Sequence, residues 1–137
     1  MKITLIGLKD NSQNIFPSLC EALVKKISNV ELAQRYAPVP EDLPLVALEA
    51  AEESDFLIVF APIEDDKIAS FVKRKLVDVE LASKTRILKL VSDEYSASGD
   101  LYEFENEKHA LVEKIVEMAV NILFNENAFE PKDKEFY

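Results

Sequence analysis

Glycine is scarce in this chain, with only Gly7 and Gly99 among 137 residues. Backbone cradles for phosphate use several closely spaced glycines, because a Cβ atom would keep the backbone away from the anion. The sequence therefore contains neither the dinucleotide fingerprint G-x-G-x-x-G nor the P-loop G-x-x-x-x-G-K-[ST]. These absences exclude the two most common motifs for binding nucleotides.

Cysteine and histidine are equally scarce, with one residue of each type, Cys20 and His109. This pair cannot build a Cys/His zinc site, and we expect neither a metal nor a cofactor. A lone cysteine forms no intrachain disulfide, so Cys20 is interpreted as a small core residue of a cytoplasmic protein. No apolar run approaches the roughly 18 residues of a membrane helix, so we expect a soluble protein without a membrane partner.

Acidic residues outnumber basic ones by 26 to 16, which gives a formal net charge of -10. Nucleic-acid binding needs clustered Lys and Arg, so no nucleic-acid partner is expected. The charges are also segregated: residues 31–66 contain ten acids and one base, and residues 67–89 contain seven bases and two acids. The two stretches are interpreted either as solvated helix faces or as complementary surfaces that join neighbouring subunits head-to-tail.

Apolar periodicity predicts strands that alternate with helices along the whole chain. The strands are expected at residues 2–8, 30–36, 55–62 and 85–92, and the helices at residues 15–27, 44–53, 67–81 and 107–124. This alternation favours right-handed crossovers and a parallel sheet. The predicted fold is one α/β domain over residues 1–124, a three-layer α/β/α arrangement with a four-stranded parallel sheet. A charged tail follows at residues 125–137.

Ligands of such sheets bind at the carboxyl ends of the strands. The loops expected there are residues 9–14, 37–44, 61–66 and 93–106. In the first loop, Asn11, Ser12 and Gln13 offer amides and a hydroxyl that suit a polyol or a ring edge. The alternative interpretation is that these three residues cap the helix that follows.

The segment Val39-Pro40-Glu41-Asp42-Leu43-Pro44 resembles a motif of the lumazine synthase family, which includes the archaeal-type riboflavin synthases. In that family an acid, an aliphatic residue and a proline open a helix, and a buried strand follows. The order and spacing of elements resemble the family over residues 2–124. The resemblance implies a flavodoxin-like or lumazine synthase-like fold.

The resemblance also implies an activity without a cofactor. The loop of residues 61–67 lacks the Gly, Arg and His of lumazine synthases, which favours the riboflavin synthase branch. That transferase converts two molecules of 6,7-dimethyl-8-ribityllumazine to riboflavin. The expected partners are a ribityl-lumazine or flavin and further copies of the chain in a pentameric ring. The alternatives are a lumazine synthase, a non-catalytic flavodoxin-like module that binds a ligand or partner, and another enzyme of the same topology.

By resemblance, the substrate contacts several positions in these loops and at the start of the last helix. The predicted substrate-binding residues are Asn11, Ser12, Gln13, Asp42, Leu43, Pro44, Ala61, Pro62 and Lys108. Lys67 and His109 are the candidate catalytic residues, because Lys67 brings a charge and histidine is suited to proton transfer near neutrality. The alternatives are a helix cap at Glu41 or Asp42, a solvated lysine at position 67 and a surface histidine at position 109.

Overall fold

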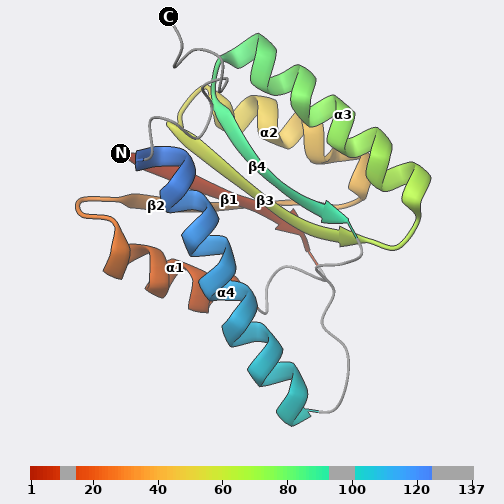
Figure 1. Cartoon of the computed structure of the whole chain (residues 1–137). Coiled ribbons are helices and arrows are strands. Elements are labelled where there is room, and N and C mark those ends of the chain that lie inside the picture. Colours follow the sequence, from red (N-terminus) through yellow and green to blue (C-terminus); the bar gives the residue numbers. More distant parts are fainter. Residues whose placement is uncertain (10–14, 93–100, 125–137) are drawn as a thin grey trace, which may run out of the picture.

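The computed structural model describes residues 1–9, 15–92 and 101–124, with side chains from residue 107 onward in the last segment (Figure 1). Four parallel strands form one sheet in the order β2-β1-β3-β4. The strands are β1 (Lys2–Leu8), β2 (Glu31–Ala37), β3 (Phe56–Ile63) and β4 (Arg86–Ser92). The helices are α1 (Phe16–Lys26), the 3-10 helix η1 (Pro40–Asp42), α2 (Leu43–Ala51), α3 (Asp66–Ser83) and α4 (Leu101–Phe124).

Helices cover both faces of the sheet, as the sequence predicts. α1 and α4 pack on one face, and α2 and α3 pack on the other (Figure 1). The strand order is that of flavodoxin-like sheets without their last strand. The predicted three-layer α/β/α fold is therefore confirmed. Among the described residues, no helix has both the length and the apolar character needed to cross a membrane.

The two central strands are apolar on both faces because helices cover both. β1 is buried from Ile3 onward, and β3 is buried at every position except Pro62. Their register places Ile3 beside Phe56 and Ile6 beside Val59. Continuous apolar runs are typical of such fully covered parallel strands. The strand β2 is largely half-exposed, because it lies at the edge of the sheet and pairs only with β1.

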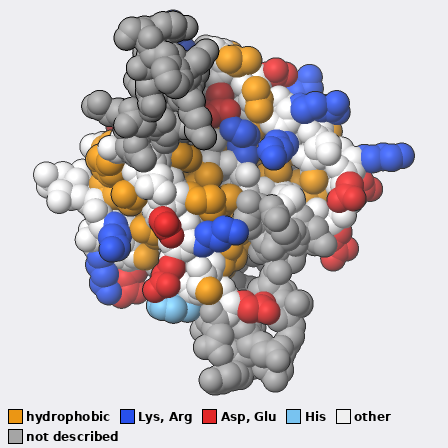
Figure 2. All heavy atoms as spheres, viewed as in Figure 1, with side chains coloured by type: hydrophobic (Ala, Val, Ile, Leu, Met, Phe, Trp, Pro, Cys, Tyr) orange, Lys and Arg blue, Asp and Glu red, His pale blue; other side chains and the backbone are white. Residues whose placement is uncertain are grey.

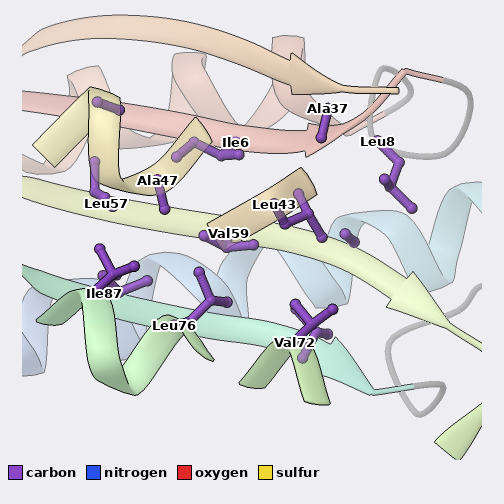
Figure 3. Packing of buried hydrophobic residues seen from close by; sticks show 14 of the residues in the cluster. Ile6, Leu8, Ala37, Leu43, Ala47, Leu57, Val59, Val72, Leu76 and Ile87 are labelled. Atoms are coloured by element: carbon purple, nitrogen blue, oxygen red, sulfur yellow. The ribbon is translucent and has the colours of Figure 1, made fainter. Parts of the chain in front are cut away.

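The side chains on the two faces differ in size. The face under α2 and α3 is filled by many small residues, among them Ala47, Ala50 and Ala51 (Figure 3). The face under α1 and α4 buries larger side chains, including Phe16 and Phe56, which have no exposed surface. The sheet is therefore covered by one layer rich in alanine and one rich in large side chains.

The predicted boundary of the last helix is wrong. The polar composition of residues 93–106 predicts a loop, but α4 begins at Leu101 and extends past the carboxyl end of the sheet (Figure 1). Glu103 and Glu105 explain the early start, because acidic residues are favoured near a helix amino terminus. The ends of the other predicted elements agree with the observed ones to within two residues. Residues 93–100 and the tail at 125–137 lie outside the described residues.

The strand order also fixes where a ligand crevice is expected. The chain passes from β1 to β2 on one side and then returns across β1 to β3. This change of direction makes the carboxyl ends of β1 and β3 the topological switch point, where open α/β sheets bind ligands. Lys9 follows β1 at this end of the sheet, and Glu64 follows β3.

Candidate functional site

The connection between β3 and α3 is short and acidic. Glu64 and Asp65 alone separate the two elements. The Oδ1 atom of Asp65 accepts hydrogen bonds from the backbone N–H of Lys67 at 2.9 Å and of Ile68 at 3.2 Å. Asp65 therefore starts the helix, because its carboxylate accepts hydrogen bonds from the free N–H groups and its negative charge interacts favourably with the helix dipole.

The Asp65 cap determines which ligands suit this end of α3. Helix amino termini bind phosphate through free backbone N–H groups. Here Asp65 already occupies two of those groups, and the neighbouring Glu64 and Asp66 are exposed carboxylates. A phosphate would therefore meet three negative charges and fewer free donors. This end of α3 is therefore better suited to a neutral ligand.

Asp42 lies where the sequence places it, at the start of α2. It occupies the N-cap position, but its side chain makes no cap hydrogen bond, so the alternative interpretation of Asp42 as a cap is not supported. Its backbone N–H donates to the carbonyl oxygen of Val39 at 3.1 Å. The side chain is half-buried. A carboxylate that is not used for capping remains available to accept hydrogen bonds from hydroxyl groups.

A buried cluster holds the start of α2 close to the end of β3 and the start of α3. Its members here are Leu43, Ala61, Ile63 and Ala69 (Figure 3). Leu43 and Ala61 have no exposed surface, so only their backbone atoms are available to a ligand. Pro44 and Pro62 are half-buried, and Lys67 is exposed. The structure thus brings one group of predicted residues together on the α2/α3 side of the sheet.

Ser92 adds a group that the sequence analysis missed. Its hydroxyl oxygen is buried at the end of β4 and has no hydrogen-bond partner among the described residues. Ser92 is paired in register with Ile63 at the end of β3. Buried hydroxyls normally have partners, so this one is suited to a polar ligand at the carboxyl end of the sheet. A serine at a strand end looks like a turn residue, and only the register reveals its neighbour.

Lys108 and His109 lie apart from this group. Both line a groove of about 740 Å³ between α1 and α4, on the opposite layer of the sheet. The imidazole Nε2 atom of His109 lies 3.1 Å from Oε1 of Glu113, and the His109 side chain is 77% exposed (Figure 2). The structure therefore does not place His109 with Asp42 or Lys67. Its position agrees with the alternative of a surface histidine.

Cys20 belongs to a small hydrogen-bonded chain beside β2. The side-chain amide of Gln34 donates to Sγ of Cys20 at 3.5 Å, and the hydroxyl of Tyr36 donates to Oε1 of Gln34 at 2.7 Å. Burial raises the pKa of the Cys20 thiol, and the bond from Gln34 offsets part of that rise. A raised pKa keeps the thiol protonated, so Cys20 lacks the character of an activated nucleophile.

The remaining predicted positions, Asn11, Ser12 and Gln13, lie outside the described residues. Within the described part of the chain, no group of His, Cys, Asp or Glu side chains is arranged to hold a metal ion. No protein-family model matches the chain, and no curated protein shows significant sequence similarity to it. At the carboxyl end of the sheet, the described residues therefore offer the carboxylate of Asp42 before α2, the ammonium of Lys67 in the first turn of α3 and the hydroxyl of Ser92 at the end of β4.

Proposed function

We propose that the protein is a riboflavin synthase-like transferase that converts two molecules of 6,7-dimethyl-8-ribityllumazine to riboflavin. The observation that supports this most is the capped, acidic start of α3, where Asp65 bonds the N–H groups of Lys67 and Ile68. A ribityl-lumazine carries no phosphate and is tolerated there. The phosphorylated substrate of a lumazine synthase would be repelled by Glu64, Asp65 and Asp66.

The proposed chemistry needs no cofactor, because the protein binds and orients both substrates. A four-carbon unit leaves one lumazine and joins the second, so the products are riboflavin and the substituted pyrimidine that remains. No external oxidant or reductant is required. Holding two substrates in a reactive geometry can supply about 7–11 kcal/mol of the barrier.

Three described side chains receive roles in this proposal. Asp42 accepts hydrogen bonds from ribityl hydroxyls, and the buried hydroxyl of Ser92 gains the partner that it lacks among the described residues. Lys67 places a positive charge at the crevice, where it stabilises negative charge that develops on the heterocycle. His109 is not needed, because it lies on the other layer of the sheet.

The test is to incubate purified protein with 6,7-dimethyl-8-ribityllumazine and to follow riboflavin fluorescence. Asp42→Asn and Ser92→Ala each remove one polar contact, so kcat/KM should fall about 10- to 100-fold, the equivalent of roughly 1–3 kcal/mol. Glu31→Gln, an exposed carboxylate at the amino end of β2, is the control and should leave the rate unchanged. The proposal fails if the wild-type protein forms no riboflavin.

A second candidate is a non-catalytic flavodoxin-like module that binds the same ligand. The separation of His109 from Asp42 and Lys67 favours it, because no described histidine stands at the crevice to transfer protons. Calorimetry with the ribityl-lumazine distinguishes the two functions. Binding without fluorescent product supports the module, whereas absence of binding contradicts both candidates.

A further inference from the structure

The outward side of α2 combines apolar and acidic residues. Leu45 is 57% exposed and Leu48 is 41% exposed, and both point away from the buried side of the helix. Carboxylates flank these leucines one helical turn away. We call this surface the acidic face: Glu41, Leu45, Leu48, Glu49 and Glu52.

The outward side of α3 combines apolar and basic residues. Leu81 is 75% exposed and Val77 is 39% exposed, one turn apart on the helix. We call this surface the basic face: Lys73, Arg74, Val77, Leu81 and Lys84. Blue side chains in the upper right of Figure 2 lie in the region where Figure 1 draws α3 and β4.

The positive charges of the basic face are not neutralised within the described part of the chain. Asp78 lies 3.8 Å from Lys75, and Glu80 pairs with Lys89, so the two acids of α3 beyond its first turn are already engaged. No described acidic side chain lies within ion-pair distance of Lys73, Arg74 or Lys84. An acidic surface on another molecule would complement these charges.

The two faces lie toward opposite edges of the sheet. Glu49 of the acidic face pairs with Arg35 of the edge strand β2 at 3.5 Å. Lys73 and Leu81 of the basic face line a cavity of about 600 Å³ beside the other edge strand, β4. Complementary surfaces at opposite edges of one molecule suit a heterologous contact, in which each copy uses both faces.

Side chains at the centre of β4 disfavour the pairing of a further strand with this edge of the sheet. A carboxylate oxygen of Glu80 accepts from the backbone N–H of Ile87 at 2.8 Å, and Nζ of Lys89 donates to the carbonyl oxygen of Ile87 at 3.1 Å. These side chains occupy backbone groups that a new strand would need. A partner at this edge therefore contacts side chains of α3 rather than extending the sheet.

We propose that a second copy of this chain docks head-to-tail, with the acidic face of one copy against the basic face of the next. Each face brings two exposed apolar residues and three charges, and the charges are opposite. The lengths also match, because α2 is about 14 Å long and the basic stretch of α3 is about 17 Å long. This inference does not depend on the proposed enzymatic function.

The first experiment measures mass by sedimentation and native mass spectrometry at ionic strengths of about 0.01 M and about 1 M, where the Debye length falls from about 30 Å to about 3 Å. The wild-type chain should form an oligomer at low ionic strength and dissociate at least partly at high ionic strength. A monomer under both conditions would overturn the proposal. The number of copies follows from the measured mass.

The second experiment reverses one face at a time. Glu41→Lys/Glu52→Lys and Lys73→Glu/Arg74→Glu should each be monomeric, because both faces then carry charge of one sign. A mixture of the two variants should associate again, which nonspecific damage to the fold would not produce. The proposal is contradicted if either variant alone assembles like the wild-type chain or if the mixture remains monomeric.

Two further variants control this experiment. Lys26→Glu and Glu31→Lys reverse exposed charges outside both faces and should assemble like the wild-type chain. Leu81→Ser leaves the charge unchanged and removes apolar contact, so association should weaken about tenfold, the equivalent of about 1.4 kcal/mol. Unchanged association of Leu81→Ser would exclude this residue from the interface and contradict the proposed docking.

Discussion

The α1/α4 layer packs large side chains against the sheet, whereas the α2/α3 layer packs many alanines. Phe16 and Phe56 fill the first interface, and Ala47 and Ala50 fill part of the second, all of them buried. Small side chains allow a helix to approach its neighbours closely, whereas large ones fill a wider space. The two layers should therefore respond differently to changes in side-chain volume.

The layers also differ in the surface that they present. The α2/α3 layer carries the acidic and basic faces, and Asp42 and Lys67 lie at the starts of its two helices. The α1/α4 layer carries an open groove of about 740 Å³ with charges of both signs, including His109. This difference is the reason for proposing the ligand site on the side of α2 and α3. The following substitutions test this contrast.

The largest effect is expected from shortening a large residue of the α1/α4 layer. Phe56→Ala leaves a cavity under α1 and α4, and should lower the free energy of unfolding by about 3–5 kcal/mol. The control is Phe71→Ala, because the side chain of Phe71 on α3 is 38% exposed. This variant should lower the free energy of unfolding much less. Chemical denaturation measures both. If both variants lose the same free energy of unfolding, burial of Phe56 is not what stabilises this layer.

Enlarging a small residue should disturb the α2/α3 layer. Ala47 has no exposed surface, so Ala47→Leu forces extra volume between α2 and the sheet and should cost about 1–3 kcal/mol. Ala82→Leu on the exposed side of α3 is the matched control, with an expected change within about 0.5 kcal/mol. If Ala47→Leu is as stable as the wild-type chain, the close packing inferred for this layer is wrong.

The Glu80–Lys89 pair connects α3 to the edge strand β4. Glu80→Ala removes the acceptor of the Ile87 N–H and leaves Lys89 without its carboxylate, at an expected cost of about 1–3 kcal/mol. Asp78→Ala breaks an exposed pair with Lys75 and should change stability by less than about 0.5 kcal/mol. If the denaturation curves of the two variants coincide, Glu80 does not stabilise the contact between α3 and β4.

The smallest effect is expected at the start of α3. Asp65→Ala removes the cap of the Lys67 and Ile68 N–H groups and should cost about 1 kcal/mol. The same change frees two donors, so inorganic phosphate should bind more tightly to this variant. Glu64→Ala keeps the cap and is the control for stability. If Asp65→Ala lowers the free energy of unfolding no more than Glu64→Ala does, Asp65 does not stabilise the helix.

Most of the fold follows from sequence patterns. The strand of residues 2–8 is predicted with its observed ends, because its apolar run is bounded by polar residues. The start of α4 is missed because residues 93–106, taken together, are polar enough to resemble a loop, whereas acids are also favoured at a helix start. Local composition could not decide between these two effects.

The site is less predictable than the fold. Asp65 is identifiable from sequence, since an acidic run before an apolar helix pattern indicates a cap. Ser92 becomes a candidate only through its register beside Ile63 and through its hydroxyl, which has no partner among the described residues. The separation of His109 from Asp42 depends on which side of the sheet each helix covers, and this is a tertiary property.

The central proposal is that the ligand binds at the carboxyl end of the sheet, near the starts of α2 and α3 and the end of β4. The most direct test is to record backbone NMR shifts while 6,7-dimethyl-8-ribityllumazine is added to the isotope-labelled protein. The account predicts the largest shifts at Asp42, Lys67 and Ser92, with little change at Lys108 and His109. Shifts confined to Lys108, His109 and the rest of the α1/α4 groove, or no shifts at all, would contradict it.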